Sequence, residues 1–192
     1  MSLSSLLPTW IASAFDIAPP GQNILYIAIT NRNAGRVIRV RQVNFYVSSE
    51  VAVAGVLIVA RLGKRTGQTI AFAGTAITPI QMDTNDSIAF NGADNIDVLR
   101  LPTGGNGART EFKNIILSSD EAVVTTLDAD AYSSELFPRD TSALIKFENT
   151  LKKPLVLRTD GTTFQGCEIV HVAPAGAVGN VGVEILFTVS DT

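Results

Sequence analysis

Hydrophobic and polar residues alternate with a period of two in several short stretches of this chain. The clearest is "VGVEILFTVS" (181–190), where Val181, Val183, Ile185, Phe187 and Val189 face one way and Gly182, Glu184, Leu186, Thr188 and Ser190 the other. This pattern is typical of a β-strand with one face in the core. The opposite face of this strand is only partly polar.

Other apolar, β-branched runs predict further strands. They include "ILYIAITN" (24–31), "GVLIVARLGKR" (55–65) and the shorter candidates "SIAF", "IDVLRL", "FKNIILSS" and "EAVVTTL". Turn residues separate them, and eight or more short strands at such spacing favour an antiparallel β-sandwich or barrel. We therefore predict an all-β fold, an antiparallel β-sandwich of the jelly-roll kind.

Two hairpins are predicted from turn chemistry. Asn33-Ala34-Gly35 would join 24–31 to the strand "RVIRVRQVNFYV", and Asp160-Gly161 would join the two halves of 153–172. In the stretch after Gly35 the apolar set changes sides near Arg41 and Gln42, which predicts a β-bulge.

The first 22 residues differ from the rest. "LSSLLPTWIASAF" (3–15) places Leu7, Trp10, Ile11, Ala14 and Phe15 at helical spacing, and "APPGQ" (18–22) then breaks the pattern. We predict an N-terminal arm over 1–22 and a single sandwich domain over 23–192. The segment either packs on its own domain or docks on a neighbouring subunit, because side chains as large as Trp10 and Phe15 favour burial.

The amino-acid composition of the chain favours assembly into an oligomer. Of the 192 residues, 46% are hydrophobic and only 17% are charged, below the roughly 25% of typical soluble proteins. Such a weakly charged surface favours coverage by other subunits. The net charge of −3 disfavours a nucleic-acid binder. The run "GVLIVA" is too short for a membrane span, and the N-terminus lacks the pattern of a signal peptide.

No strong catalytic motif is present, so we predict no enzyme, cofactor or metal. Cys167 is the only cysteine, and extended spacing puts it about 13 Å from the only histidine, His171, too far for a nucleophile and base pair.

Asp128 and Asp130 would lie about 7 Å apart on an extended segment, which suits a glycosidic acid and base pair, but a solvated acidic loop is the simpler interpretation. "PTGGNGAR" lacks the phosphate-loop pattern and predicts a surface loop.

Charge is segregated along the chain. Residues 32–65 carry seven basic side chains against Glu50 alone, and acidic residues cluster later. The two sets either neutralise each other within the fold or meet across subunit boundaries, where complementarity fixes register. Without interleaved aromatic side chains, Arg36, Arg39 and Arg41 do not suit single-stranded nucleic acid. We predict that these arginines, together with Leu7, Trp10, Ile11 and Phe15, form protein contacts.

The stretches "GRVIRVRQVNFYV", "KPLVLRTDGTTFQG" and "GNVGVEILFTV" resemble small β-rich virion proteins of tailed bacteriophages, especially head decoration (cement) and auxiliary capsid proteins. The resemblance implies a structural protein, often a homotrimer, that binds the major capsid protein on the virion. The lone Cys167 fits a virion protein assembled in the reducing cytoplasm of the host. A tail or fibre component and a carbohydrate-binding module are the alternatives.

Overall fold

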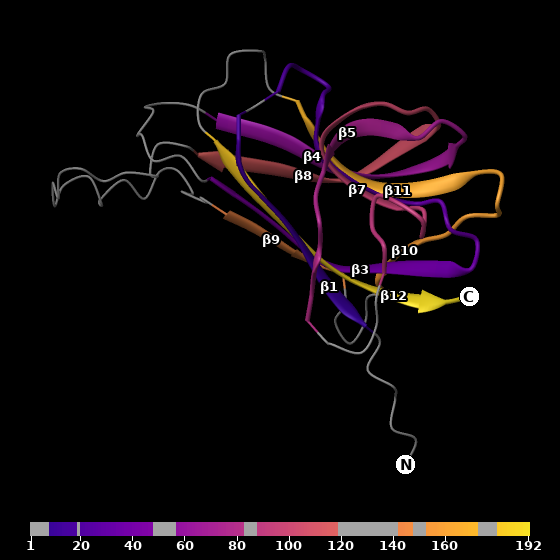
Figure 1. The fold of residues 1–192 in the computed structure, drawn as a ribbon. Helices are drawn as coiled ribbons and strands as arrows, with labels where there is room; N and C mark the ends of the chain where they lie inside the picture. The colour runs from indigo at the N-terminus through magenta and orange to yellow at the C-terminus, as the bar shows by residue number, and fades with distance from the viewer. Residues whose placement is uncertain are drawn as a thin grey trace, which may run out of the picture.

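The computed structural model describes residues 8–18, 20–47, 57–82, 88–118, 142–147, 153–172 and 180–192. Among these residues the chain forms strands and no helix. Two antiparallel sheets pack face to face around one main core, so the structure is a β-sandwich (Figure 1). The predicted fold class is confirmed at this level.

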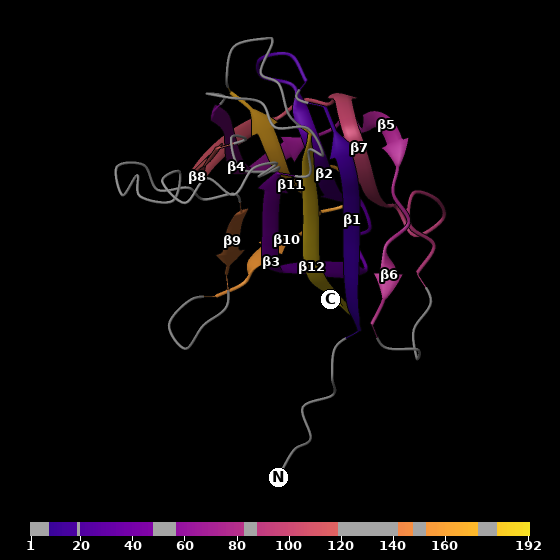
Figure 2. The same ribbon diagram turned by 90° about the vertical axis from the view of Figure 1, so that its left-hand side faces the viewer.

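Sheet A has the order β10-β3-β12-β1-β6, and β9 also pairs with β3. Figure 2 shows β3, β12 and β1 side by side, with β6 next to β1. Its strands are β1 (Thr9–Ile17), β3 (Arg36–Val47), β6 (Ile80–Gln81), β9 (Ser142–Lys146), β10 (Leu155–Leu157) and β12 (Val181–Asp191).

Sheet B has the order β5-β7-β2-β11-β4-β8. Its outer side carries a small second cluster around Leu25, Ala28 and Phe72. Its strands are β2 (Leu25–Asn31), β4 (Leu57–Gln68), β5 (Phe72–Ala76), β7 (Ile96–Gly104), β8 (Ala108–Ser118) and β11 (Phe164–His171).

The main core follows from the alternation in the strands. The five inward side chains of β12, from Val181 to Val189, are fully buried, as its sequence pattern predicts. Aromatic rings join the two sheets: Tyr26 of β2 meets Phe45 of β3 edge to face, with ring centroids 5.3 Å apart. The sandwich therefore closes over one continuous apolar interior.

The predicted bulge in β3 is confirmed. The register between β12 and β3 shifts after Leu186↔Gln42, and the next pair is Phe187↔Val40. Arg41 is thus the extra residue, and it allows both Val40 and Val43 to point into the core.

Both predicted hairpins are wrong as strand pairings. β2 belongs to sheet B and β3 to sheet A, so the turn after Asn31 carries the chain from one sheet to the other. The Asn31 amide holds this crossing, because its Nδ2 donates to the carbonyl oxygens of Arg36 (2.8 Å) and Leu157 (3.1 Å). Likewise β10 and β11 lie in different sheets, although Asp160-Gly161 forms a tight turn closed by the bridge Thr159↔Phe164.

The helical spacing predicted for 3–15 is also wrong over the described part. Residues Thr9–Ile17 form β1, paired with β12, so this part of the predicted 1–22 arm is an integral strand of sheet A. Trp10, Ala12 and Ala14 alternate into the core, which satisfies their burial without a helix. A bulge between Ala14 and Ile17, where Asp16 has φ 51°, ends the regular pairing.

The four shorter strand candidates differ in outcome. Residues 88–90 of "SIAF" are outside any strand, whereas "IDVLRL" and "FKNIILSS" correspond to β7 and β8. The candidate "EAVVTTL" lies outside the described residues, as does Leu7.

Candidate interaction surface

The only cysteine and the only histidine of the sequence are buried in the core. Cys167 and His171 lie four residues apart on β11, and neither is exposed. Burial raises the pKa of the Cys167 thiol to about 12, so the thiol stays protonated at neutral pH. His171 Nδ1 is hydrogen-bonded to the Tyr26 hydroxyl at 2.7 Å. Neither residue is placed to meet a substrate, and Asp128 and Asp130 lie outside the described residues.

The described residues hold no group of three or more His, Cys, Asp or Glu side chains that could bind a metal ion. Within the same part of the chain, no helix is long and apolar enough to cross a membrane.

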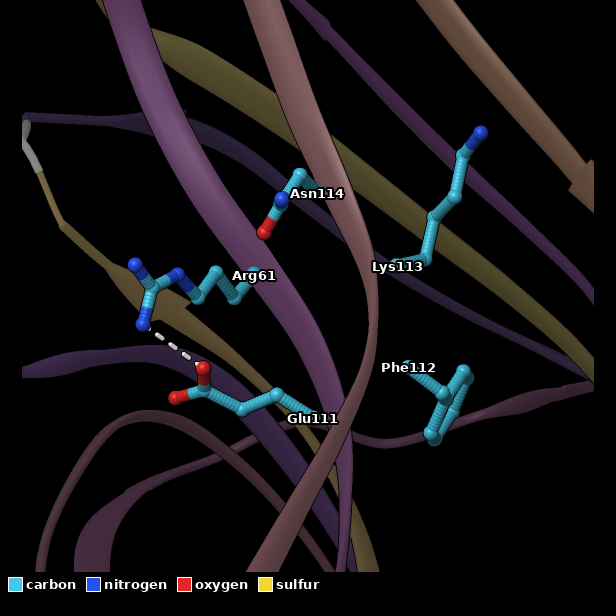
Figure 3. Close-up of a pocket in the computed structure, with 5 residues that line it drawn as sticks. All are labelled: Arg61, Glu111, Phe112, Lys113 and Asn114. Atoms are coloured by element: carbon cyan, nitrogen blue, oxygen red, sulfur yellow. Dashed lines mark hydrogen bonds and ion pairs between the residues drawn. The ribbon is translucent and has the colours of Figure 1, made fainter.

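A shallow surface hollow lies at the β4–β8 edge of sheet B (Figure 3). It is lined by Arg61 of β4 and by Glu111, Phe112, Lys113 and Asn114 of β8. Arg61 Nη1 lies 2.7 Å from Glu111 Oε2, so this charge pair is satisfied internally, and the Lys113 side chain points away from it. The hollow is open to solvent.

Much of the basic segment is neutralised inside the fold. Arg32 pairs with Asp97 of β7, and Arg36 Nη1 lies 3.0 Å from Asp191 of β12. Arg65 makes a two-pronged pair with Glu168, with N–O distances of 2.7 and 3.0 Å. Internal neutralisation, one of the two interpretations of the charge pattern, therefore holds for these arginines.

Arg39 is different. It lies on β3, and its Nη1 donates to Ser190 Oγ at 2.5 Å. Among the described residues no carboxylate pairs with it, in contrast to Arg36. Arg41, the bulge residue, reaches Thr188 Oγ1 at 3.4 Å. Both side chains contact outward-facing hydroxyls of β12 and so lie over the same side of sheet A.

Cross-strand pairing defines what we term the outer face of sheet A. Its central row runs Ile80↔Ile11↔Leu186↔Gln42↔Lys146 across five strands. On one side lies the row Thr9↔Thr188↔Arg39, and on the other the row Ser13↔Glu184↔Asn44↔Leu144. Directly paired residues in a sheet point to the same side, so these side chains share one surface.

This outer face concentrates exposed apolar side chains. Eight large hydrophobic residues are exposed in the described part of the chain, and four belong to this face or its margin. Met82 extends β6 because its N–H donates to the carbonyl oxygen of Thr9, and Phe15 continues the outward alternation of β1. The four and their exposed fractions are Ile80 (65%), Met82 (64%), Leu144 (52%) and Phe15 (51%).

The end of this face near β12's start is acidic. Glu184 accepts a hydrogen bond from Asn44 Nδ2 at 3.2 Å. The Tyr46 ring lies against Gly182, where a Cβ would overlap it. Burial raises the pKa of Tyr46, and the negative charges of Glu184 and Asp16 add to that rise.

The sequence matches no family model, and neither curated proteins nor solved structures gave a match.

The structure brings together part of the predicted contact set. Ile11, Phe15, Arg39 and Arg41 gather at the outer face of sheet A, and Arg36 stands at the start of β3. Trp10 does not belong there, because it is buried at 5% exposure and packs edge to face on Phe90. The alternation simply turns Trp10 inward, opposite to Ile11.

Sequence reasoning missed other members of this face. The alternation in β12 could have placed Glu184 and Leu186 on this face, because both residues lie on the side of the strand opposite to its core residues. Ile80 and Leu144 had no comparable signal, since β6 spans only two residues and β9 five.

Proposed function

We propose that the protein is a structural component of a virus particle, and specifically a capsid decoration (cement) protein of a tailed bacteriophage. The observation that carries this proposal is the outer face of sheet A, where exposed apolar side chains such as Ile80, Met82 and Leu144 gather. Such a patch on a protein surface marks an interaction site. A rigid sandwich with this face suits a protein that works by adhesion.

The character of the remaining surface supports the same role. Cys167 and His171 are buried in the core. The hollow at Arg61 and Glu111 is open, and these two side chains form an ion pair with each other. Catalysis needs reactive groups aligned within reach of a bound substrate. The described residues therefore suit a protein that binds other proteins better than one that catalyses a reaction.

We further propose that the sandwich is a jelly roll. Its support is the order in which the chain visits the sheets. β1 and β3 enter sheet A while β2 and β4 enter sheet B, and the last strands β11 and β12 insert between them. The resulting neighbours, β1-β12-β3-β10 and β2-β11-β4-β8, suit two interlocked four-stranded sheets, with β5, β6, β7 and β9 as additions.

The proposed partners are other copies of this chain and the major capsid protein. The resemblance to decoration proteins favours a homotrimer on the outside of the shell. By bridging several subunits of the capsid shell, a small rigid protein without catalytic activity would help the shell to resist internal pressure.

The test uses capsids assembled without this protein. The purified full-length chain should sediment with them in a saturable manner, and electron microscopy should show added density on the head. Density on the tail would replace the decoration role with a tail role. Failure to bind particles at any ionic strength would contradict both.

A further inference from the structure

We propose that two copies of this chain pair face to face through the outer face of sheet A, about a two-fold axis that runs along the row Ile11–Leu186–Gln42. This inference concerns self-association, and it assigns to a second copy the same face that supports the proposed adhesive role. In an assembly of the proposed trimers, this contact would link the trimers in pairs.

The first argument is the position of two charges. Arg39 and Glu184 both lie on this face, and neither has an ion-pair partner of opposite charge among the described residues. Their side chains are hydrogen-bonded to neutral groups, Arg39 to the Ser190 hydroxyl and Glu184 to the Asn44 amide. Most other arginines of the described chain have a carboxylate beside them, as Arg32 and Arg65 do.

The second argument is their spacing. Arg39 pairs with Thr188, which lies two residues from Leu186 on β12, and Glu184 lies two residues from Leu186 in the other direction. Each charge is thus about 7 Å from the central row along the strand. Rotation about that row exchanges the two sides and brings Arg39 of one copy over Asn44 and Glu184 of the other.

The third argument is the apolar centre. On the axis, Ile80, Ile11 and Leu186 of one copy meet the same residues of the second, as a two-fold contact requires. Five strands at about 4.8 Å give this face a width near 24 Å, enough for a modest interface. Lys146, at the β9 end of the row, is exposed and can extend outward at the rim.

A second copy suits this face better than a uniformly charged partner. The face is basic on one side of its apolar row and acidic on the other, so a partner of a single charge would be repelled on one side. A second copy presents the inverse order after the two-fold rotation.

Cross-linking tests the axis. In a Leu186→Cys variant, the new thiols of two copies would face each other, and packed sheets lie about 10 Å apart, which suits a short bis-maleimide better than a disulfide. We expect a cross-linked dimer on a denaturing gel. The native Cys167 is fully buried and does not compete. If Leu186→Cys folds poorly, Gln42→Cys, which lies on the same row, provides a second test of the axis.

The matched control is Ile116→Cys. Ile116 is 59% exposed on β8, between the core residues Ile115 and Leu117, and so faces outward from sheet B. It should not cross-link. Cross-linking at Ile116 but at neither Leu186 nor Gln42 would overturn the proposal.

A charge swap tests the pairing. Arg39→Glu and Glu184→Arg should each weaken the dimer by about tenfold or more in sedimentation equilibrium, and the double variant should recover most of the loss. Single variants that leave the dimer unchanged would contradict the proposal. Capsid binding, measured separately, reports on the proposed function, so the two can fail independently.

Discussion

Tyr26 of β2 and His171 of β11 form a buried polar pair where the two sheets meet. The Tyr26 hydroxyl and His171 Nδ1 are 2.7 Å apart, and neither side chain is exposed. The Tyr26 ring also meets Phe45 of sheet A. Burial raises the pKa of Tyr26, which keeps its hydroxyl protonated. The only histidine is therefore part of the core.

Tyr26→Phe should destabilise the fold. The substitution removes the hydrogen bond to a buried imidazole, and this should cost about 1–3 kcal/mol in the free energy of unfolding. Urea denaturation measures the loss. Tyr46→Phe is the matched control, because the Tyr46 hydroxyl makes no hydrogen bond within the described residues; it should change stability by less than about 0.5 kcal/mol. Equal effects of the two variants would contradict this role for Tyr26.

Arg65→Met should be among the more damaging single changes on sheet B. Glu168 is only 1% exposed, so loss of its two-pronged partner leaves a buried carboxylate without its main counter-charge. Breaking such a pair costs about 3–5 kcal/mol. Chemical denaturation should show this loss.

Arg61→Met provides the comparison. The Arg61 side chain is 42% exposed and its partner Glu111 is 28% exposed, so the pair is screened by water. Its removal should cost less than about 1 kcal/mol. A similar cost for Arg61 and Arg65 would mean that burial of Glu168 does not set the energy.

Cys167 should make stability fall at alkaline pH. Burial raises the pKa of its thiol from 9.0 to about 12, so the folded protein keeps a proton that the unfolded chain loses. The contribution of this thiol is complete below pH 9 and declines above it, with a slope approaching about 1.4 kcal/mol per pH unit. Denaturation from pH 8 to 10.5 measures it. Cys167→Ala should show a shallower decline, and parallel curves for the two proteins would refute this assignment.

Gly107 should tolerate alanine less well than Gly67. Both have positive φ, 95° and 64°, but a Cβ at Gly107 would overlap the carbonyl oxygen of Thr66, whereas a Cβ at Gly67 meets nothing within 4 Å. Gly67→Ala should cost about 1 kcal/mol for the backbone alone, and Gly107→Ala at least about 2 kcal/mol. Thermal unfolding of both variants decides between them. The reverse order would show that the close approach of these loops is unimportant.

The sequence pattern predicts single strands well because burial is local to each strand. Val181 to Val189 alternate and are buried, and the change of side around Arg41 marks the bulge. Both features depend only on which way successive side chains point.

Strand pairing was harder to predict because it is set by residues far apart in the chain. A turn such as Asn33-Ala34-Gly35 favours a reversal but does not determine whether the next strand joins the same sheet. β3 instead pairs with β12, some 140 residues away. In the same way, the residues at helical spacing around Trp10 form a strand beside β12, which separates them: Trp10 points inward, whereas Ile11 and Phe15 point outward.

The candidate surface was predictable only in part. Alternation places Ile11 and Leu186 on an outward face, but Ile80 and Leu144 join it through short edge strands without a strong pattern of their own. A surface composed of five strands depends on their order, which the local sequence does not specify.

The most direct test of an adhesive role is sedimentation velocity of the purified full-length chain over a wide concentration range. We predict that the sedimentation coefficient rises with concentration, and that a folded Leu186→Asp variant, which loses the face-to-face contact, has a lower value at each concentration. A wild-type chain that stays a single copy at the highest concentration, with the same profile as Leu186→Asp, would contradict the account.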